Sequence, residues 1–278
     1  MSAAVRSRRA LAGARAQLLG RSPLGRAWRT ASYRRLRRRL AGPRLLEAFA
    51  ASYPKAFFVE IGSNDGDQHD HLRPLILSRP WRGIMVEPVP YVFERLQRNY
   101  AELDRIVLEN AAIGPRDGEL PFFHLRRAGS AERARLPDWY DGIGSLSSAV
   151  VLSHRDQIPD IDGRLVRTLV PSLTFESLCR RHSVDRLDLL LVDAEGHDWE
   201  ILRGIDLANR RPRVIVYEHY HLSGEARRDC RAHLDQLGYE TMEEGFDTFC
   251  LRPNGDELTR RWRRLRPAVR GISAHEDR

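Results

Sequence analysis

Three ionisable side chains follow one strongly apolar run of the chain. Asp193, Glu195 and His197 come directly after residues 189–192, which are all Leu or Val. Ionisable groups at the tip of a buried strand are costly unless they are paired or used. Histidine titrates near neutral pH, so we predict His197 as a general base, with Asp193 as the second choice. We expect Glu195 to lie beside them at the ligand edge of a sheet.

Two other interpretations of this run stay open. His197 could be an ordinary first residue of a helix whose side chain hydrogen-bonds locally. Acids together with a histidine could also bind a metal, but one D-x-E-x-H run is weak evidence for such a site. We therefore predict no metal ligands.

A turn rich in small and polar residues follows an earlier apolar run. Glu60 lies within the run 57–61, and Gly62, Asn64 and Gly66 come after it. In an open α/β sheet, ligands bind beyond the carboxyl ends of the strands. Glycine lets the backbone approach a ligand closely, and asparagine tolerates left-handed geometry. The turn therefore indicates a cofactor contact, although an ordinary strand-to-loop turn would have a similar sequence.

The next two apolar runs also end in polar residues. Glu87 ends the run 83–87, and a carboxylate there can accept hydrogen bonds from the ribose hydroxyls of a nucleoside cofactor. NAD-binding folds use the same device, so Glu87 indicates a nucleoside in general. Asn110 and Ala111 follow the third run; Ala111 would leave room for an adenine ring, and Asn110 could hydrogen-bond the base or nearby loops. A plain strand end fits them equally well.

A fifth apolar run, 214–217, ends in a similar way. It is followed by Glu218 and His219, and then by Tyr220 and His221. A strand whose tip is simply solvated would explain these residues. Because the tip after residue 192 has matching chemistry, we favour a cleft shared by both tips.

Short apolar runs that alternate with amphipathic stretches must position these residues. This pattern is typical of a parallel sheet wrapped by helices, which is an α/β fold. We predict strands near 56–61, 83–87, 105–110, 187–193, 213–218, 239–243 and 247–252. We predict helices near 90–101, 174–183, 197–204 and 224–237, the last ending at Gly238. Residues 126–164 are the least regular stretch and suit a substrate-facing insertion.

The net charge of +8 is distributed unevenly along the chain. Residues 1–46 hold 13 arginines and no acid, whereas residues 47–278 hold 33 basic and 38 acidic residues. We predict a flexible Arg-rich arm over 1–46, a domain over 47–255 and a polar tail over 256–278. A mildly acidic body argues against a nucleic-acid partner. The arm could be a solvated tail, a basic helix at a membrane surface or a mitochondrial transit peptide.

The remaining composition concerns the compartment. The three cysteines, Cys179, Cys230 and Cys250, are widely spaced and odd in number, which fits a reducing cytosol better than a disulfide framework. No stretch approaches 18 uninterrupted apolar residues, so we expect no transmembrane helix. We expect a cytoplasmic protein, with peripheral membrane contact through the arm as one option. The oligomeric state cannot be derived from these features.

Taken together, these runs resemble the FkbM-type methyltransferases over residues 55–252. The first motif is Glu60-Ile-Gly-Ser-Asn-Asp-Gly66, with Asp70 nearby. Further matching segments are Trp81 to Pro88, Asn99-Tyr100, Asn110 to Ile113, Leu173 to Leu178, Asp188 to Leu202, Tyr217-Glu218-His219 with Leu222, and Gly238-Tyr239 before Asp247-Thr248.

The resemblance implies a class I methyltransferase Rossmann-like fold: a seven-stranded, mostly parallel sheet with helices on both faces. It implies S-adenosyl-L-methionine (SAM) as the cofactor and O-methylation of a hydroxyl on a sugar, lipid or natural product. By position, the methionine part of SAM falls to Glu60, Gly62, Asn64 and Gly66, the ribose to Glu87, and the adenine to Asn110 and Ala111. Asp193, also expected at the cofactor, would face the transferred methyl group together with Glu195 and His197.

Two other classes of protein are alternatives to a SAM-dependent methyltransferase. A nicotinamide oxidoreductase would want G-x-G-x-x-G opening a helix directly, whereas the glycines here are spaced G-x-x-x-G. A non-catalytic SAM-binding module would have no need of the ionisable cluster at 193–197. A small-molecule, glycan or lipid acceptor is therefore the expected partner.

Overall fold

The structure is a computed structural model that describes residues 40–68 and 70–266 of the chain. The chain divides into two units, Met1–Arg44 and Leu45–Arg278, and the fold described here is that of the second. Most of the predicted arm, residues 1–39, lies outside the described residues. Within the described ranges, no helix is long and apolar enough to cross a membrane.

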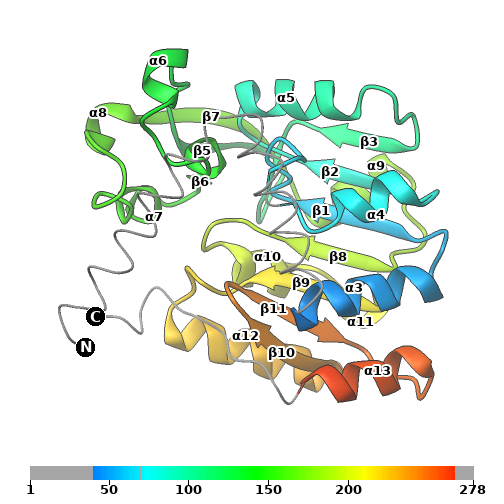
Figure 1. Ribbon diagram of the computed structural model, residues 1–278. Helices are drawn as coiled ribbons and strands as arrows, with labels where there is room; N and C mark the ends of the chain where they lie inside the picture. Colours follow the sequence, from blue (N-terminus) through cyan, green and yellow to red (C-terminus); the bar gives the residue numbers. More distant parts are fainter. Residues whose placement is uncertain (1–39, 69, 267–278) are drawn as a thin grey trace. The chain divides into compact units, whose positions relative to one another are not determined.

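A seven-stranded sheet forms the centre of the fold (Figure 1). Its order is β10-β11-β9-β8-β1-β2-β3, and only β11 runs in the direction opposite to the other six strands. The strands are β1 (Phe57–Ile61), β2 (Arg82–Val86), β3 (Ile106–Glu109), β8 (Leu189–Val192), β9 (Val214–Glu218), β10 (Glu240–Glu244) and β11 (Asp247–Leu251). All seven strands predicted from the apolar runs are present, and the class I methyltransferase fold is confirmed.

Helices cover both faces of this sheet because its strands bury apolar residues on both sides. One face packs against α9 (Phe175–Arg181), α10 (Asp198–Gly204), α11 (Leu207–Arg210) and α12 (Gly224–Gln236). The other is covered by α3 (Ala41–Ser52), α4 (Arg73–Ser78), α5 (Pro90–Tyr100) and α13 (Glu257–Leu265); α3, α4 and α13 lie in front in Figure 1. The four predicted helices are all present, and Gly238 follows α12 with a left-handed φ of 82°.

Alternation along β1 shows how one strand serves both faces. Val59 and Ile61 belong to the core beneath α9 and α10. Phe58 points the other way, where its ring lies 6.2 Å from that of Trp81, and Trp81 in turn lies 5.8 Å from Phe49 of α3. Successive strand residues point to opposite faces, so an apolar run can be buried on both sides.

A second, four-stranded sheet was not predicted. Its order is β4-β7-β5-β6, with β4 (Ala112–Ile113), β5 (Gly118–Leu125), β6 (Gly144–Ser145) and β7 (Leu165–Leu173). β5 and β7 pair antiparallel along their whole lengths. Each contains a proline, Pro121 or Pro171, which disfavours a strand assignment from sequence. Their pairing also joins segments far apart in the chain, which no local pattern reports.

The irregular stretch 126–164 lies between these two long strands. It contains the short helices α6 (Ser130–Arg133), η1 (Tyr140–Gly142), α7 (Ser148–Leu152) and α8 (Ile161–Arg164). Tyr140, Val151 and Ile158 form part of its own small apolar core. The stretch is therefore an ordered insertion that is anchored at both ends by the second sheet.

A helix lies across or beside each end of the predicted domain 47–255. Residues from 256 onward were expected to form a polar tail, but α13 buries Leu258 and Trp262, which are 1% and 0% exposed. The Trp262 Nε1–H donates to Glu240 Oε2 at 2.8 Å. At the other end, α3 begins at Ala41, within the stretch expected to be the arm. In both places the apolar residues have helical spacing, but the many arginines around them made the sequence look polar.

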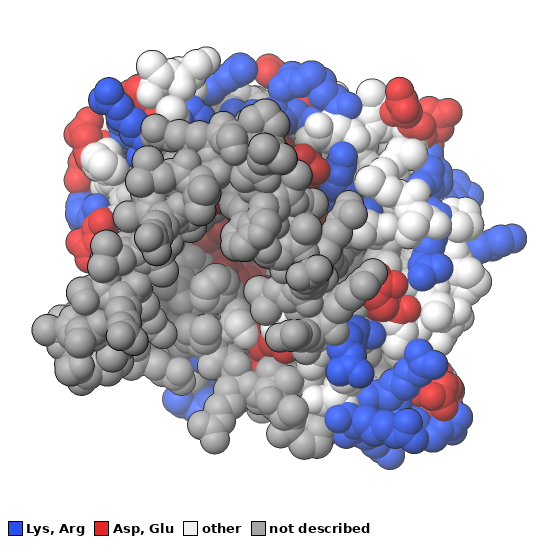
Figure 2. Space-filling view, in the orientation of Figure 1, with Lys and Arg blue, Asp and Glu red and all other residues white. Residues whose placement is uncertain are grey.

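Charged side chains of both signs are interspersed over the face shown in Figure 2. Arginines gather at the lower right, where Figure 1 places α13. This helix carries Arg260, Arg261, Arg263 and Arg264, and several of them pair with Glu240 or Glu257. The patch is thus partly neutralised by neighbouring acids.

Candidate active site

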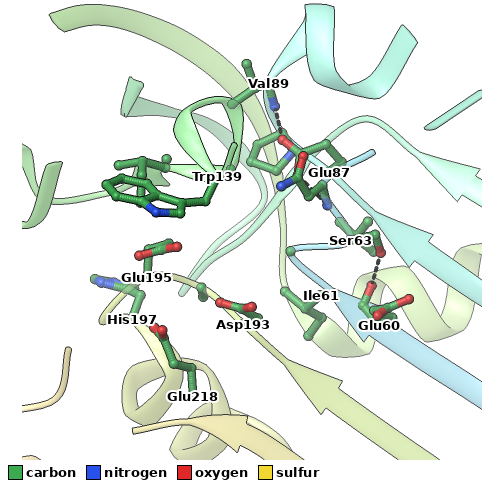
Figure 3. Close-up of a pocket in the computed structure, with 18 of the residues that line it drawn as sticks. Glu60, Ile61, Ser63, Glu87, Val89, Trp139, Asp193, Glu195, His197 and Glu218 are labelled. Atoms are coloured by element: carbon green, nitrogen blue, oxygen red, sulfur yellow. Dashed lines mark hydrogen bonds between the residues drawn. The ribbon is translucent and has the colours of Figure 1, made fainter. Parts of the chain in front are cut away.

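A cavity of about 400 Å³ opens at the carboxyl ends of β1, β2, β8 and β9. Figure 3 shows Glu60 and Glu87 on one side of it, with Glu195, His197 and Glu218 on the other. Trp139, from the insertion, lies above Glu195 in this view. The strand tips singled out from the sequence therefore do meet at one edge of the sheet.

Gly62 brings the tips of β1 and β8 together. Its φ is +80°, and a Cβ placed there would lie 1.7 Å from the carbonyl oxygen of Asp193. Its N–H donates to the carbonyl oxygen of Val86 at 2.9 Å. Only glycine permits both the left-handed backbone and this close approach. Asn64, two residues on, also has a positive φ of 49° and lines the cavity.

Glu87 lines the cavity at the tip of β2 and is only 6% exposed. Oε2 accepts the N–H of Asn64 at 3.0 Å, and Oε1 accepts the N–H of Val89 at 2.8 Å. Burial raises the pKa of this carboxyl to about 7, against the lowering effect of these two hydrogen bonds. Each oxygen keeps a further lone pair, which is the capacity that two ribose hydroxyls would need.

Glu60 and Asp70 form a buried acidic pair at the same side of the cavity. Glu60 is 3% exposed, and its Oε2 has no hydrogen-bond partner among the described residues. Burial, and then the charges of Asp70 and Asp193, raise the pKa of Glu60 well above its ordinary range. Burial likewise raises the pKa of Asp70, whose Oδ1 accepts the N–H of Arg73 at 3.0 Å. A cationic group of a ligand would offset the repulsion between these two carboxylates.

The remaining residues predicted at the cofactor divide into two kinds. Ala111 lines the cavity, as expected for a residue beside a flat ring. Asn110 does not; its Nδ2–H donates to the carbonyl oxygens of Glu87 and Pro88, at 2.7 and 3.2 Å. Gly66 packs against α5, where a Cβ would lie 2.5 Å from the Tyr100 ring. Asn110 and Gly66 therefore shape the loops that carry the lining residues.

Asp193, Glu195 and His197 all line the opposite end of the cavity. Asp193 is exposed to the cavity yet lies deep in the protein. Burial, together with the charges of Glu195 and Asp198, raises its pKa well above the ordinary range. His197 is the N-cap residue of α10, as the helix-start interpretation expected, but its side chain makes no cap hydrogen bond to that helix. Burial lowers the pKa of its imidazole.

The carboxylate at this end contacts a different histidine from the one expected. Glu195 Oε2 lies 3.0 Å from Nε2 of His221, which follows β9. His221 lines the cavity, whereas His219 is fully buried and its Nδ1 lies 2.9 Å from Thr248 Oγ1. The two histidines are only two residues apart in the same loop, yet only His221 reaches the cavity. The sequence alone did not show which of the two would do so.

The sequence analysis missed several lining residues, among them Trp139, His154 and Phe246. Trp139 and His154 come from the insertion, and their ring centroids lie 5.2 Å apart. The ring of Phe246, which is half exposed, is tilted against the ring of Tyr220 at a centroid distance of 4.6 Å. Trp139 and Phe246 stand in stretches without a regular apolar pattern, so only the fold brings them to the cavity. Aromatic walls of this kind suit a bulky acceptor.

Comparison with known proteins agrees with this geometry. A sequence profile described as the Methyltransferase FkbM domain matches residues 60–241. The chain is also similar to "2-O-methyltransferase NoeI" of Sinorhizobium fredii (strain NBRC 101917 / NGR234), with 26% identity over 166 residues. That match covers 60% of this chain and 64% of the relative, which is less than two thirds of the relative's length.

Two solved structures were compared as well. One is a methyltransferase FkbM from Methylobacillus flagellatus KT, with 14% identity, a TM-score of 0.46, and coverage of 71% of this chain and 44% of that one. The other is a methyltransferase from Geobacter sulfurreducens, with 12% identity, a TM-score of 0.39, and coverage of 76% and 77%. The family match spans the strand tips from Glu60 to β10, which carry most of the cavity. The chain therefore belongs to the FkbM methyltransferase domain family.

Proposed function

We propose that this methyltransferase uses SAM to methylate a hydroxyl oxygen of a sugar, lipid or natural product. The observation that carries the proposal is the single cavity that joins two chemically different ends. One end holds Glu60 and Glu87, and the other holds Asp193, Glu195 and His197. A donor bound at the first end would present its reactive group to an acceptor at the second.

The residues at the first end fit SAM. When bound, SAM supplies a methyl group on a positively charged sulfonium, which is a strong electrophile. Glu87 would accept hydrogen bonds from the ribose hydroxyls, because each of its oxygens has one backbone partner and room for another. Glu60 Oε2, buried without a hydrogen-bond partner in the described chain, would accept from the α-ammonium group. Ala111 would leave room for the adenine.

At the second end, this chain's residues have two tasks. The aromatic side chains of Trp139, Tyr220 and Phe246 would hold the acceptor so that its oxygen faces the methyl group, because positioning supplies most of the catalysis for so reactive a donor. His197 would take the hydroxyl proton, since its ring lines the cavity and does not cap the helix. Asp193, which also lines this end, is the second candidate.

Transfer to oxygen is supported by the similarity to a relative named as a 2-O-methyltransferase. Membership of the family speaks against the nicotinamide oxidoreductase alternative. The ionisable groups at the second end speak against a non-catalytic SAM-binding module, because two carboxylates and an imidazole gathered in one cavity are costly without a task.

The test uses the purified full-length chain with methyl-labelled SAM and a panel of sugars, lipids and hydroxylated natural products. We expect the label to move to an acceptor oxygen, with one S-adenosylhomocysteine formed for each methyl group transferred. Mass spectrometry would locate the added CH₂ on a former hydroxyl. Transfer to nitrogen or carbon, or a calorimetric titration in which SAM fails to bind, would contradict the proposal.

A further inference from the structure

We propose that His154, Glu195 and His221 bind a divalent transition-metal ion at the acceptor end of the cavity. One ligand atom of each residue lies within 4.8 Å of those of the other two. The three come from different segments: the insertion after α7, the loop after β8 and the loop after β9. The role given to this ion below rests on the proposed function, but the binding site itself stands on the donor geometry.

Two of the donor atoms are buried without satisfied hydrogen bonds. His154 is only 9% exposed, and its Nε2 has no hydrogen-bond partner among the described residues. Glu195 Oε2 is shielded from solvent and, although 3.0 Å from His221 Nε2, makes no hydrogen bond within the described chain. Buried polar atoms are rarely left unpaired, and an unseen ion or water is one recognised reason. Both atoms belong to one cluster, so one ion could satisfy both.

Neighbouring residues hold the segments that carry His154 and Glu195 in place before any ion binds. The Trp139 ring lies 5.2 Å from that of His154, and the N–H groups of Gln157 and Ile158 donate to the His154 carbonyl oxygen at 2.9 and 3.0 Å. The hydroxyl of Ser145 donates to the carbonyl oxygen of Glu195 at 2.8 Å. The backbone on which two of the three donors stand is therefore ordered without an ion.

Gly196 explains how the loops after β8 and β9 come close enough. Its φ is +88°, and a Cβ there would lie 3.3 Å from both the Cβ of His221 and a methyl group of Val150. The glycine between Glu195 and His197 therefore lets three segments converge. The ring centroids of His154 and His221 lie 5.4 Å apart at an interplanar angle of 74°, so the two imidazoles are close and nearly perpendicular.

The donor set selects the class of ion. Two imidazoles with one carboxylate suit zinc, iron or cobalt, whereas Mg²⁺ and Ca²⁺ prefer all-oxygen sites. Three protein ligands also leave coordination positions open, as in catalytic sites. Asp193 and Glu218 lie beside Glu195, within the same 4.8 Å limit, and would add compensating negative charge.

An ion at this place would orient the acceptor. The acceptor oxygen attacks the methyl carbon, the carbon–sulfur bond breaks with its electron pair going to sulfur, and the hydroxyl proton passes to His197. A cation beside the hydroxyl would favour its deprotonation and fix its direction. An acceptor would be recognised by the binding of its oxygen atoms to the ion. A compound with two neighbouring hydroxyls suits this site, because both oxygens could occupy open coordination positions of the ion.

The test titrates the untagged, full-length protein, first stripped with a chelator, with Co²⁺. We expect one Co²⁺ per chain, with visible absorption bands that report imidazole ligands. His154→Ala and His221→Ala should each weaken binding by at least about 100-fold, because loss of even an outer partner weakens metal sites by about 10- to 100-fold. The matched control is His182→Ala, whose histidine pairs with Glu109 outside the cavity; it should bind Co²⁺ as the wild type does.

A second variant distinguishes loss of the metal site from misfolding, and a second ligand distinguishes failure of the metal site from failure of the proposed function. If His154→Ala unfolds, judged by its thermal transition, His154→Gln keeps the bulk of the side chain and should still lose Co²⁺. Failure of the wild type to bind Co²⁺ or Zn²⁺, or wild-type binding by a folded His154 variant, would overturn the site. SAM affinity is measured in parallel: Co²⁺ binding without SAM binding would remove the proposed function and leave the metal site standing.

Discussion

Glu87→Ala is expected to weaken SAM binding while leaving the fold intact. Glu87 is almost fully buried at the cofactor end of the cavity, and its two oxygens accept the N–H groups of Asn64 and Val89. The substitution removes the ribose acceptor and also leaves these two donors unpaired. Glu87→Gln is the companion variant, because it keeps one acceptor oxygen and the bulk of the side chain but loses the charge.

The magnitude follows from the environment of the carboxylate. A hydrogen bond to a charged, desolvated group contributes about 1.5–3 kcal/mol, which corresponds to a loss of about 10- to 100-fold in affinity. Protonation should have the same effect as mutation. Because burial raises the pKa of Glu87 to about 7, and because the ionised form binds the ribose, affinity should be constant well above pH 7, fall as the pH drops through 7, and level off at a total loss of about 10- to 100-fold.

Isothermal titration with S-adenosylhomocysteine and with its 2′-deoxyribose analogue separates ribose recognition from general damage. The wild type should bind the ribose compound more tightly than the deoxyribose compound, and Glu87→Ala should bind both equally. The change in this preference measures the interaction free energy between the carboxylate and the hydroxyl. If Glu87→Ala bound S-adenosylhomocysteine as tightly as the wild type, or kept the full preference, the assignment of Glu87 to the ribose would be wrong.

Four further outcomes are expected. Gly62→Ala should abolish SAM binding or folding, because a Cβ would meet the backbone of the loop after β8 at 1.7 Å; Gly238→Ala, with a similar φ in open space, should cost only about 1–2 kcal/mol by thermal melting. Trp262→Ala should lower the free energy of unfolding in urea by about 3–5 kcal/mol, because the side chain is fully buried, and an unchanged midpoint would refute its structural role. His197→Ala should reduce turnover by about 10²–10⁴-fold with SAM affinity retained, and near wild-type turnover would exclude it as the base. Removal of residues 1–39 should leave SAM binding unchanged but reduce retention on anionic liposomes at low salt; equal retention by both chains would eliminate the membrane contact.

The sequence by itself determined the main sheet and the strand tips. Runs such as 189–192 are apolar over several consecutive residues, and that pattern reports a strand buried on both faces wherever it occurs. Because parallel strands end at one edge, the polar residues after them had to gather there, which placed Glu87 and Asp193 in one cavity. These inferences need only local periodicity and one rule of α/β topology.

Local patterns were less informative where charge or proline obscured them. In α13 the apolar residues Leu258 and Trp262 stand among arginines, so the segment looked like a polar tail. In β5 and β7, Pro121 and Pro171 argued against strands that are stabilised by pairing with each other. Tertiary packing overrides such weak local signals because burial of a whole face outweighs the preference of single residues.

Only the tertiary structure decided which side chains meet at the acceptor end. His154 belongs to an insertion with no regular pattern, and His221, not His197, lies against Glu195. Contacts between residues far apart in the chain depend on how loops close, and loop closure is set by packing such as that of Trp139 on His154. The sequence specifies this packing only through the whole fold. A local motif can therefore predict where a strand ends, but it does not predict which distant residues will contact that strand end.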